Sequence, residues 1–236
     1  MERLDKIISA TGKKSRREVR EMVRQGRVLV DGKPAPAADM KVDPQTAVIL
    51  LDGEPLGYEK FTYVMLHKPA GVLTATEDRR QETVLDLLPP ELRRRALSPV
   101  GRLDKDTEGL LLLTNDGQLA HRLLSPKSHV DKVYYARVDG ALEPGDIAAF
   151  AAGMTLGDGL ECLPAGLEIL AAGETSECLV TLREGKFHQV KRMLAARGKP
   201  VEYLKRLSMG SLRLDDTLAP GEFRLLTAAE EAQLQR

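Results

Sequence analysis

The chain has 236 residues, of which 42% are hydrophobic and 30% are charged, and its formal net charge at pH 7 is zero. This composition is typical of a globular protein of one or two domains and excludes long disorder. No apolar run approaches the roughly 20 residues that span a bilayer, and the charged N-terminus lacks the apolar segment of a secretory signal. We therefore expect a cytoplasmic protein.

The two cysteines, Cys162 and Cys178, have no neighbouring histidine in the sequence. Their spacing fits neither a disulfide scaffold nor a C-x-x-C zinc site. It also argues against a zinc-dependent base deaminase, which needs His and Cys ligands at recognisable spacing. We expect buried thiols and no metal, and the absence of a glycine-rich dinucleotide loop indicates no organic cofactor.

The zero net charge conceals a segregation of charge along the chain. Residues 1–33 contain ten Lys and Arg against five acidic residues, and residues 183–213 contain nine against two. The rest of the chain is acidic to the same extent. Lys and Arg clusters are the electrostatic footprint of phosphate contacts, so these segments favour a nucleic-acid partner.

The first sixty residues predict a small module of two helices and short strands. A first helix stops at Gly12. A second begins with a capping box between Ser15 and Glu18 and ends before Gly26. Residues 28–30 are expected to form a strand, and an Asp-Gly turn follows.

The second helix carries an arginine face. Arg16, Arg20 and Arg24 fall at i, i+4 and i+8, and Arg17 and Arg27 flank them. A solvated helix surface is the plain alternative. With only two glutamates nearby these five arginines cannot pair locally, so we interpret the face as an RNA-binding surface.

The order of helix, basic helix, short strand and Asp-Gly turn over roughly residues 2–50 resembles the S-four RNA-binding module. A module of this size buries little apolar surface and usually needs a tethered neighbour. We expect the module and its linker to occupy residues 1–58 and a larger domain to occupy residues 59–236.

From Phe61 onward the sequence predicts alternating short strands and helices. Strands are expected at residues 63–66, 110–114, 132–138, 178–182, 201–207 and 211–214. Helices are expected at residues 84–88, 118–124, 147–152 and 186–196, and after Thr227. Connections partly by turns and partly by helices favour an α+β domain whose mixed, largely antiparallel sheet is flanked by helices.

Charged residues are concentrated in the stretch 101–109, directly before a buried apolar strand. Asp104, Asp106 and Glu108 match the first ligands of a calcium loop, but Asn115 stands where a bidentate Glu is required. A second interpretation is a polar turn whose carboxylates cap neighbouring amides. A third is a catalytic site, in which one carboxylate is nucleophile or base beside a cation.

A cation for the catalytic interpretation lies in the second basic segment. Phe187, Val190 and Leu194 form the expected inward stripe of a helix, and Lys191 lies at its edge. Lys191 is therefore well placed to pair with an aspartate in a half-buried cleft. Arg192 points nearly opposite to Val190, so we expect it to meet solvent or phosphate.

Four motifs in order resemble those of the RsuA-type family of ribosomal RNA pseudouridine synthases. They are Lys68–Gly71, Gly101–Leu110, Lys132–Tyr134 and Glu184–Met193. The S-four module in front completes the architecture of that family. Two residues depart from its pattern, since Phe187 stands where tyrosine is common and Val133 where threonine is common.

The resemblance implies roles for individual residues. Asp104 matches the catalytic aspartate, Arg102 a residue that positions the flipped nucleotide, and Lys191 the basic partner of the aspartate. Tyr134 matches the active-site tyrosine and could stack on the extruded uracil, whereas Tyr135 is expected in the core. Lys68 is expected to shape a cleft wall or contact phosphate, with an ordinary turn as the alternative. His188 is expected on a helix surface or in a hydrogen bond.

The implied activity is the isomerisation of uridine to pseudouridine in ribosomal RNA without a cofactor. We favour 16S rRNA, and a paralogue acting on 23S rRNA is the alternative. The aspartate either attacks C1′ or starts an elimination to a glycal. The expected partner is ribosomal RNA or a ribosomal assembly particle, with no membrane, and the protein is expected to be a monomer. A non-catalytic RNA-binding or ribosome-assembly protein and a base-excising glycosylase are the rival functions.

Overall fold

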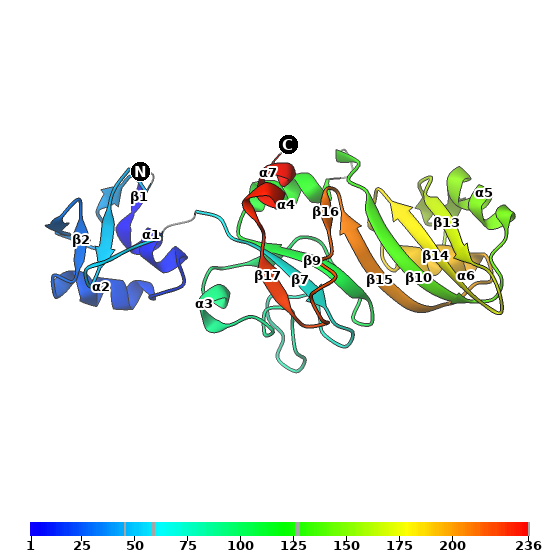
Figure 1. Ribbon diagram of the computed structural model, residues 1–236, viewed down its shortest axis with the longest axis horizontal. Coiled ribbons are helices and arrows are strands. Elements are labelled where there is room, and N and C mark those ends of the chain that lie inside the picture. Colours follow the sequence, from blue (N-terminus) through cyan, green and yellow to red (C-terminus); the bar gives the residue numbers. More distant parts are fainter. Residues whose placement is uncertain (45, 58–59, 126–127, 236) are drawn as a thin grey trace. The chain divides into compact units, whose positions relative to one another are not determined.

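The computed structural model describes residues 1–44, 46–57, 60–125 and 128–235 (Figure 1). The chain forms two compact units, of which one comprises Met1–Thr62 with Leu85–Ser98 and the other Tyr63–Val84 with Pro99–Arg236. The boundary expected between residues 58 and 59 lies outside the described residues. Within the described ranges, no helix is long and apolar enough to cross a membrane.

The first unit begins with two helices, α1 (Leu4–Ala10) and α2 (Arg16–Arg24). The capping box expected at the start of α2 is confirmed. Ser15 Oγ accepts a hydrogen bond from the backbone N–H of Glu18, and the Ser15 N–H donates to the Glu18 carboxylate at 2.7 Å. Gly26 follows α2 with φ of +71°, a left-handed conformation that stops the helix.

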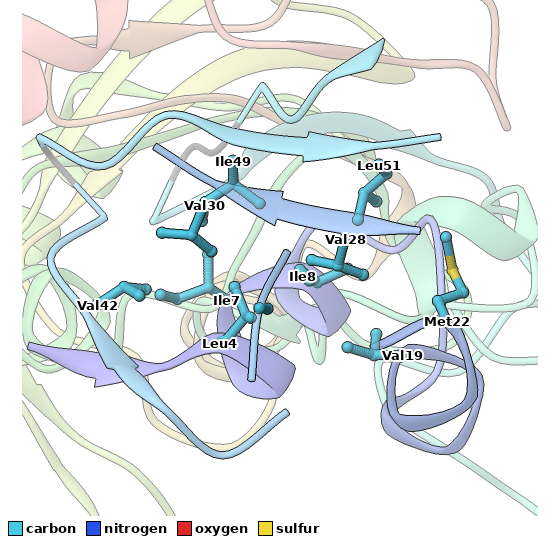
Figure 2. Close-up of a cluster of buried hydrophobic side chains, with 11 residues drawn as sticks. Leu4, Ile7, Ile8, Val19, Met22, Val28, Val30, Val42, Ile49 and Leu51 are labelled. Carbon is cyan, nitrogen blue, oxygen red and sulfur yellow. The ribbon is translucent and has the colours of Figure 1, made fainter. Parts of the chain in front are cut away.

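Four short antiparallel strands accompany these helices. Their order is β3 (Lys33–Pro34), β2 (Val28–Val30), β5 (Ile49–Leu51) and β6 (Glu54–Pro55), and β1 (Glu2–Arg3) pairs separately with β4 (Lys41–Val42). Figure 2 shows apolar side chains of α1 and α2 gathered with those of β2 and β5. Burial of this cluster joins the helices to the sheet.

The segment Leu85–Ser98 belongs to the first unit although it lies within the body of the sequence. Arg95 donates to the Thr62 hydroxyl at 2.6 Å and to the Thr11 carbonyl at 3.2 Å. Gly12 has φ of +75°, and a Cβ there would lie 2.0 Å from the Glu91 carbonyl oxygen. Only glycine permits this approach.

The helix expected at residues 84–88 is wrong, since these residues form turns. Thr83 instead forms an isolated parallel bridge with Leu73. Five residues close barely one hydrogen-bonded turn, so an isolated helix there has little to stabilise it. The helix of this region is α3 (Pro90–Arg93), with Pro90 in its first turn, where proline is favoured.

The second unit contains a nine-stranded sheet. Its strands in spatial order are β13 (Gly166–Ala171), β14 (Thr175–Leu182), β10 (Lys132–Asp139), β15 (Val201–Met209), β9 (Glu108–Thr114), β7 (Tyr63–Lys68) and β17 (Phe223–Leu225), with β16 (Leu212–Arg213) beside β15 and β8 (Ser98–Pro99) beside β9. Strand β9 pairs with β15 in parallel, whereas the pairs β10 with β14, β10 with β15, β13 with β14, β15 with β16, β7 with β9 and β17 with β7 are antiparallel. The expected mixed, largely antiparallel sheet is therefore confirmed.

Helices accompany this sheet (Figure 1). They are α4 (Gly117–Leu124), α5 (Pro144–Ala152), α6 (Gln189–Ala196) and α7 (Ala228–Leu234), and β11 (Met154–Thr155) pairs with β12 (Glu161–Cys162) as a separate hairpin. Alternate residues of β10 and β14 are buried, including Tyr134 and Cys178. Cys162 is also buried, and both thiols are free, as expected.

Candidate active site

The polar stretch 101–109 ends where β9 begins to pair with β15. Gly109 lies opposite Arg206 in the parallel register and has φ of +106°. A Cβ at position 109 would lie 2.3 Å from the Arg206 carbonyl oxygen. Arg206 is buried, and its Nε donates to the Leu110 carbonyl at 2.8 Å. Glycine is thus required for the loop to leave the sheet at this point.

The loop is held in place by residues that follow β7. The Thr74 hydroxyl donates to the Leu103 carbonyl at 2.8 Å and accepts from the Leu103 N–H at 3.2 Å. The Gly71 N–H donates to the Lys105 carbonyl at 2.7 Å. Within the loop, the Thr107 N–H donates to the Asp104 carbonyl at 3.1 Å. These bonds fix the backbone on both sides of Asp104.

Lys68 also supports the loop that carries Asp104, through hydrogen bonds from its buried ammonium group. Its ammonium donates to the carbonyl oxygens of Pro69, Lys105 and Thr107 at 2.9, 3.2 and 3.0 Å. The side chain is fully buried, and burial lowers the pKa of Lys68 to about 8. Lys68 is therefore not available to phosphate, because its charge is used inside the protein, and it shapes the wall beside Asp104 only through the loop carbonyls that it bonds.

Two basic side chains from the start of α6 approach the Asp104 carboxylate. Lys191 Nζ lies 3.5 Å from Asp104 Oδ2, and His188 Nε2 lies 3.5 Å from Asp104 Oδ1. The Asp104 side chain is 26% exposed, so it faces solvent from a half-buried position. The pairing of Asp104 with Lys191 expected from the sequence is present, and His188 adds a neighbour that the sequence did not predict.

Lys191 contacts a second carboxylate more closely. Its Nζ lies 2.5 Å from Asp106 Oδ1, and this hydrogen bond lowers the pKa of Asp106 below its ordinary value. The Asp106 side chain is 75% exposed. Lys191 is therefore shared between the two aspartates instead of being dedicated to Asp104.

The third carboxylate of the stretch has a structural partner. Glu108 accepts a hydrogen bond from the Tyr203 hydroxyl at 2.7 Å, and burial together with this contact raises the pKa of Tyr203. Glu108 and Tyr203 stand on the paired strands β9 and β15. Glu108 thus ties the start of β9 to its neighbour.

A small hollow of about 60 Å³ lies beside Asp104, and we call it the inner hollow. Its wall contains Arg102, Asp104 and Tyr134 together, as the sequence-based hypothesis requires. Its lining also contains buried apolar side chains, namely Leu103, Leu182, Val190 and Leu204, and the polar residues Thr107, Lys186, His188 and Gln189. Tyr134 is 8% exposed, whereas Tyr135 is only half-buried and meets Tyr203 edge to face. The expectation that Tyr135 is the core tyrosine is therefore wrong.

A wider hollow of about 480 Å³ also includes Asp104, and we call it the outer hollow. Phe187 and His188 lie on its wall. The expected inward position of Phe187 is wrong, because α6 begins only at Gln189 and the Phe187 side chain is 74% exposed. His188 takes a left-handed conformation with φ of +50°, which turns the chain before the helix and removes Phe187 from the helical stripe.

Comparison with known proteins assigns the family. The family model described as RNA pseudouridylate synthase matches residues 62–196, and the S4 domain model matches residues 2–48. The uncharacterized RNA pseudouridine synthase YtzG of Bacillus subtilis (strain 168) is 51% identical over 229 residues, which cover 97% of this chain and 96% of that protein. The chain belongs to the RNA pseudouridine synthase family.

Further known proteins are similar to this synthase over nearly its whole length. The ribosomal small subunit pseudouridine synthase A of Vibrio parahaemolyticus is 42% identical and covers 97% of each chain. A crystal structure of a pseudouridylate synthase is 36% identical, with a TM-score of 0.69 over 99% of this chain and 100% of that one. The family resemblance carried by the four motifs and the S-four module is thereby confirmed, and the chain is an enzyme that acts on RNA.

Arg192, which was expected to contact RNA, forms an ion pair within the protein. Arg192 Nη2 lies 2.5 Å from Asp158 Oδ1, and its side chain is only 27% exposed. Asp158 lies between β11 and β12, far from α6 in sequence. Arg192 therefore meets solvent only in part, since a distant loop supplies a carboxylate for it, and its contact with phosphate stays a prediction.

The arginine face of the S4 domain is only partly free. Arg24 pairs with Glu21 at 2.9 Å, and Arg27 makes two hydrogen bonds to the Asp52 carboxylate at 2.5 and 2.7 Å. The claim that these arginines lack local partners is therefore wrong for Arg24 and Arg27. Among the residues that the structure describes, Arg16, Arg17 and Arg20 are exposed and take part in no ion pair.

The three carboxylates of the stretch 101–109 do not surround one metal-sized site, because Asp104 and Asp106 both contact Lys191 and Glu108 contacts Tyr203. Among the described ranges, no group of three or more His, Cys, Asp or Glu side chains could hold a metal ion. A calcium loop would need the oxygens of all three carboxylates around one centre.

Proposed function

We propose that this synthase converts a uridine of ribosomal RNA to pseudouridine and that the uridine lies in 16S rRNA. The relative in Vibrio parahaemolyticus, which matches the synthase from end to end, carries the name of a small-subunit enzyme. The S4 domain with its exposed arginines would add affinity for RNA phosphates that does not depend on base sequence.

Asp104 is the nucleophile in this proposal. The observation that carries it is the position of one half-exposed carboxylate on a fixed backbone, beside Lys191 and His188 and on the wall that also holds Tyr134. Catalysis of this kind depends mainly on holding the reacting group in place. Asp106 is mostly exposed and Glu108 is bonded to Tyr203, so neither shares this position.

The reaction needs no external reagent because substrate and product contain the same atoms. An Asp104 oxygen attacks C1′, the C1′–N1 bond breaks, and the uracil leaves as an anion. After the base turns, C5 bonds to C1′ and releases the carboxylate, C5 loses its hydrogen as a proton, and N1 gains one. If the reaction instead runs through a glycal, the same carboxylate acts as the base. The uridine must leave its stack first, and Tyr134 is placed to receive the base.

The substrate assignment is tested on 16S and 23S rRNA transcripts and on ribosomal assembly particles from a deletion strain. Incubation with the synthase is expected to produce a carbodiimide-dependent primer-extension stop at one uridine of 16S rRNA and none in 23S rRNA. A stop in 23S rRNA alone would assign the large subunit. Release of free uracil would indicate a glycosylase, and tight binding without a stop would indicate a binding protein.

The three unpaired arginines of α2 are expected to contribute most of the salt dependence of binding. Replacing Arg16, Arg17 and Arg20 by Ala should lower RNA affinity more than tenfold and reduce the slope of log K against log salt by about 2. The control is Arg27→Ala, because Arg27 is also exposed but already paired with Asp52. Titrations at four salt concentrations measure both quantities. Equal slopes for the triple variant and the unmodified protein would show that α2 does not contact phosphate.

A further inference from the structure

An aromatic side chain is exposed beside the catalytic aspartate. Phe187 is 74% exposed, whereas Phe150 is fully buried. Its ring stacks on the His188 ring with centroids 3.8 Å apart and an angle of 19° between the planes. A ring held in water in this way is free to stack on the flat face of a ligand.

The segment that presents the pair is rigidly held. The buried Gln189 accepts from the Lys186 N–H at 3.1 Å and donates from Nε2 to Glu184 at 2.6 Å. His188 has a left-handed conformation with φ of +50°, which is uncommon for residues other than glycine, although histidine adopts it more readily than most. The exposure of Phe187 thus follows from a well-bonded turn, and strained backbone of this kind is often found at binding sites.

Phe187 and His188 lie where a nucleotide next to the target uridine must be accommodated. Arg102, Leu103, Asp104 and His188 line both the inner and the outer hollow, so the two meet at the catalytic aspartate. A uridine whose C1′ reaches Asp104 is covalently joined to its neighbours, and a neighbour must lie next to the inner hollow. The outer hollow is the wider of the two, and Phe187 is on its wall.

The remaining lining of the outer hollow fits RNA. Arg102 and Lys105 supply positive charge, and Lys105 Nζ donates to the neutral Gln81 side chain at 2.7 Å. Cationic grooves with aromatic side chains are the usual means of holding single-stranded nucleic acid, because every base has a flat face that can stack. A protein or lipid partner would require a broader apolar surface than this single ring.

We propose that Phe187, backed by His188, is the platform on which the nucleobase adjacent to the target uridine stacks. The ligand of the outer hollow is thus an unpaired base of the same RNA strand. The base stacks on Phe187 by its flat face, and no hydrogen bond to the base edge selects its identity. This inference rests on the proposed function, since it assumes that the target uridine lies at Asp104.

The experiment uses the absence of tryptophan from the chain. Phe187→Trp introduces a single fluorophore at the platform, and Leu170→Trp introduces one at a site that is 49% exposed and lines neither hollow. The probes are decauridylate and a ten-unit ribose phosphate chain without bases, each end-labelled so that anisotropy reports saturation.

The two variants are expected to respond differently to these probes. At saturation, decauridylate should quench the fluorescence of Phe187→Trp, and the chain without bases should leave it unchanged. Neither probe should affect the fluorescence of Leu170→Trp. Equal quenching of Phe187→Trp by both probes, or none at saturation, would overturn the proposal.

A kinetic measurement separates this inference from the proposed function. On modifiable RNA, Phe187→Ala should raise KM by about 5- to 150-fold, the range for one base stacked on an aromatic ring, with kcat changed much less. Phe187→Tyr should restore the KM, and an unchanged KM in Phe187→Ala would contradict the platform. Fluorescence quenching does not depend on turnover. If no RNA is modified while decauridylate still quenches Phe187→Trp, the proposed function fails, and Phe187 is shown to hold a base that is not the neighbour of a target uridine.

Discussion

Asp104→Asn should lower the rate of pseudouridine formation by about 10⁴-fold or more, the loss seen when a nucleophile is removed and the rest of the site is kept. Asparagine has nearly the same shape, so the hydrogen bond from Thr107 N–H to the Asp104 carbonyl and the clamp by Thr74 are unaffected. RNA affinity should stay within about threefold, because phosphate contacts elsewhere dominate it. Release of tritium from RNA labelled at uridine C5 measures the rate.

The matched control for this substitution is Asp106→Asn. Asp106 is two residues away, contacts the same Lys191 and lines neither hollow. Its replacement frees Lys191 for Asp104 and should change the rate by less than about tenfold. An equal loss in both variants would show that the charge of the loop matters and that neither aspartate alone is the nucleophile.

Lys68→Met should reduce turnover by about 100-fold while changing the free energy of unfolding by less than about 2 kcal/mol. The stability terms oppose each other. Methionine leaves the Pro69 and Thr107 carbonyls without the bond from Lys68, at about 1–3 kcal/mol each. It also removes a buried charge whose pKa shift from 10.5 to about 8 corresponds to roughly 3 kcal/mol. The loop on which Asp104 stands loses its support, so the rate falls more than the stability.

The pH dependence of stability gives a separate measure of Lys68. Its pKa in the folded protein is about 8, below the ordinary value of 10.5, so between these values the unfolded chain holds more protons. The free energy of unfolding therefore increases as the pH rises through this window, by up to about 1.4 kcal/mol per pH unit. Urea denaturation at pH 8, 9 and 10 should show a steeper rise in the unmodified protein than in Lys68→Met. Parallel curves would mean that burial does not lower the pKa of Lys68 in the folded protein.

The elements that the sequence predicted well are those specified by neighbouring residues. The capping box of Ser15 with Glu18 and the glycine stop at Gly26 each depend on atoms a few residues apart. The strand of Leu110–Leu113 follows from an apolar run, and its residues are completely buried. Local patterns of this kind need no knowledge of the rest of the chain.

Most of the differences from the expected structure concern side chains whose partners are distant in sequence, and Arg24, which pairs with the nearby Glu21, is an exception. Lys68 bonds to carbonyls 37 and 39 residues later, Arg27 to an aspartate 25 residues later, and Arg192 to Asp158 of another loop. Phe187 was expected inside a helix that begins two residues after it. The sequence suggested that the charges of Lys68, Arg27 and Arg192 are unpaired and that the Phe187 ring is buried. In each case residues elsewhere in the fold determine the actual environment of the side chain.

The sequence by itself determined the family, the two-part organisation and the proposed placement of Asp104, Arg102 and Tyr134 in one site. Motifs and apolar periodicity can be recognised from residues that are close together in the sequence. Only the tertiary structure decided that Lys191 is shared between two aspartates, that His188 stands beside Asp104, and that Lys68 supports the loop from inside. The physical reason is distance. A hydrogen bond or ion pair acts over about 3 to 4 Å, and only the folded sheet brings β7, the stretch 101–109 and α6 within that range of one another.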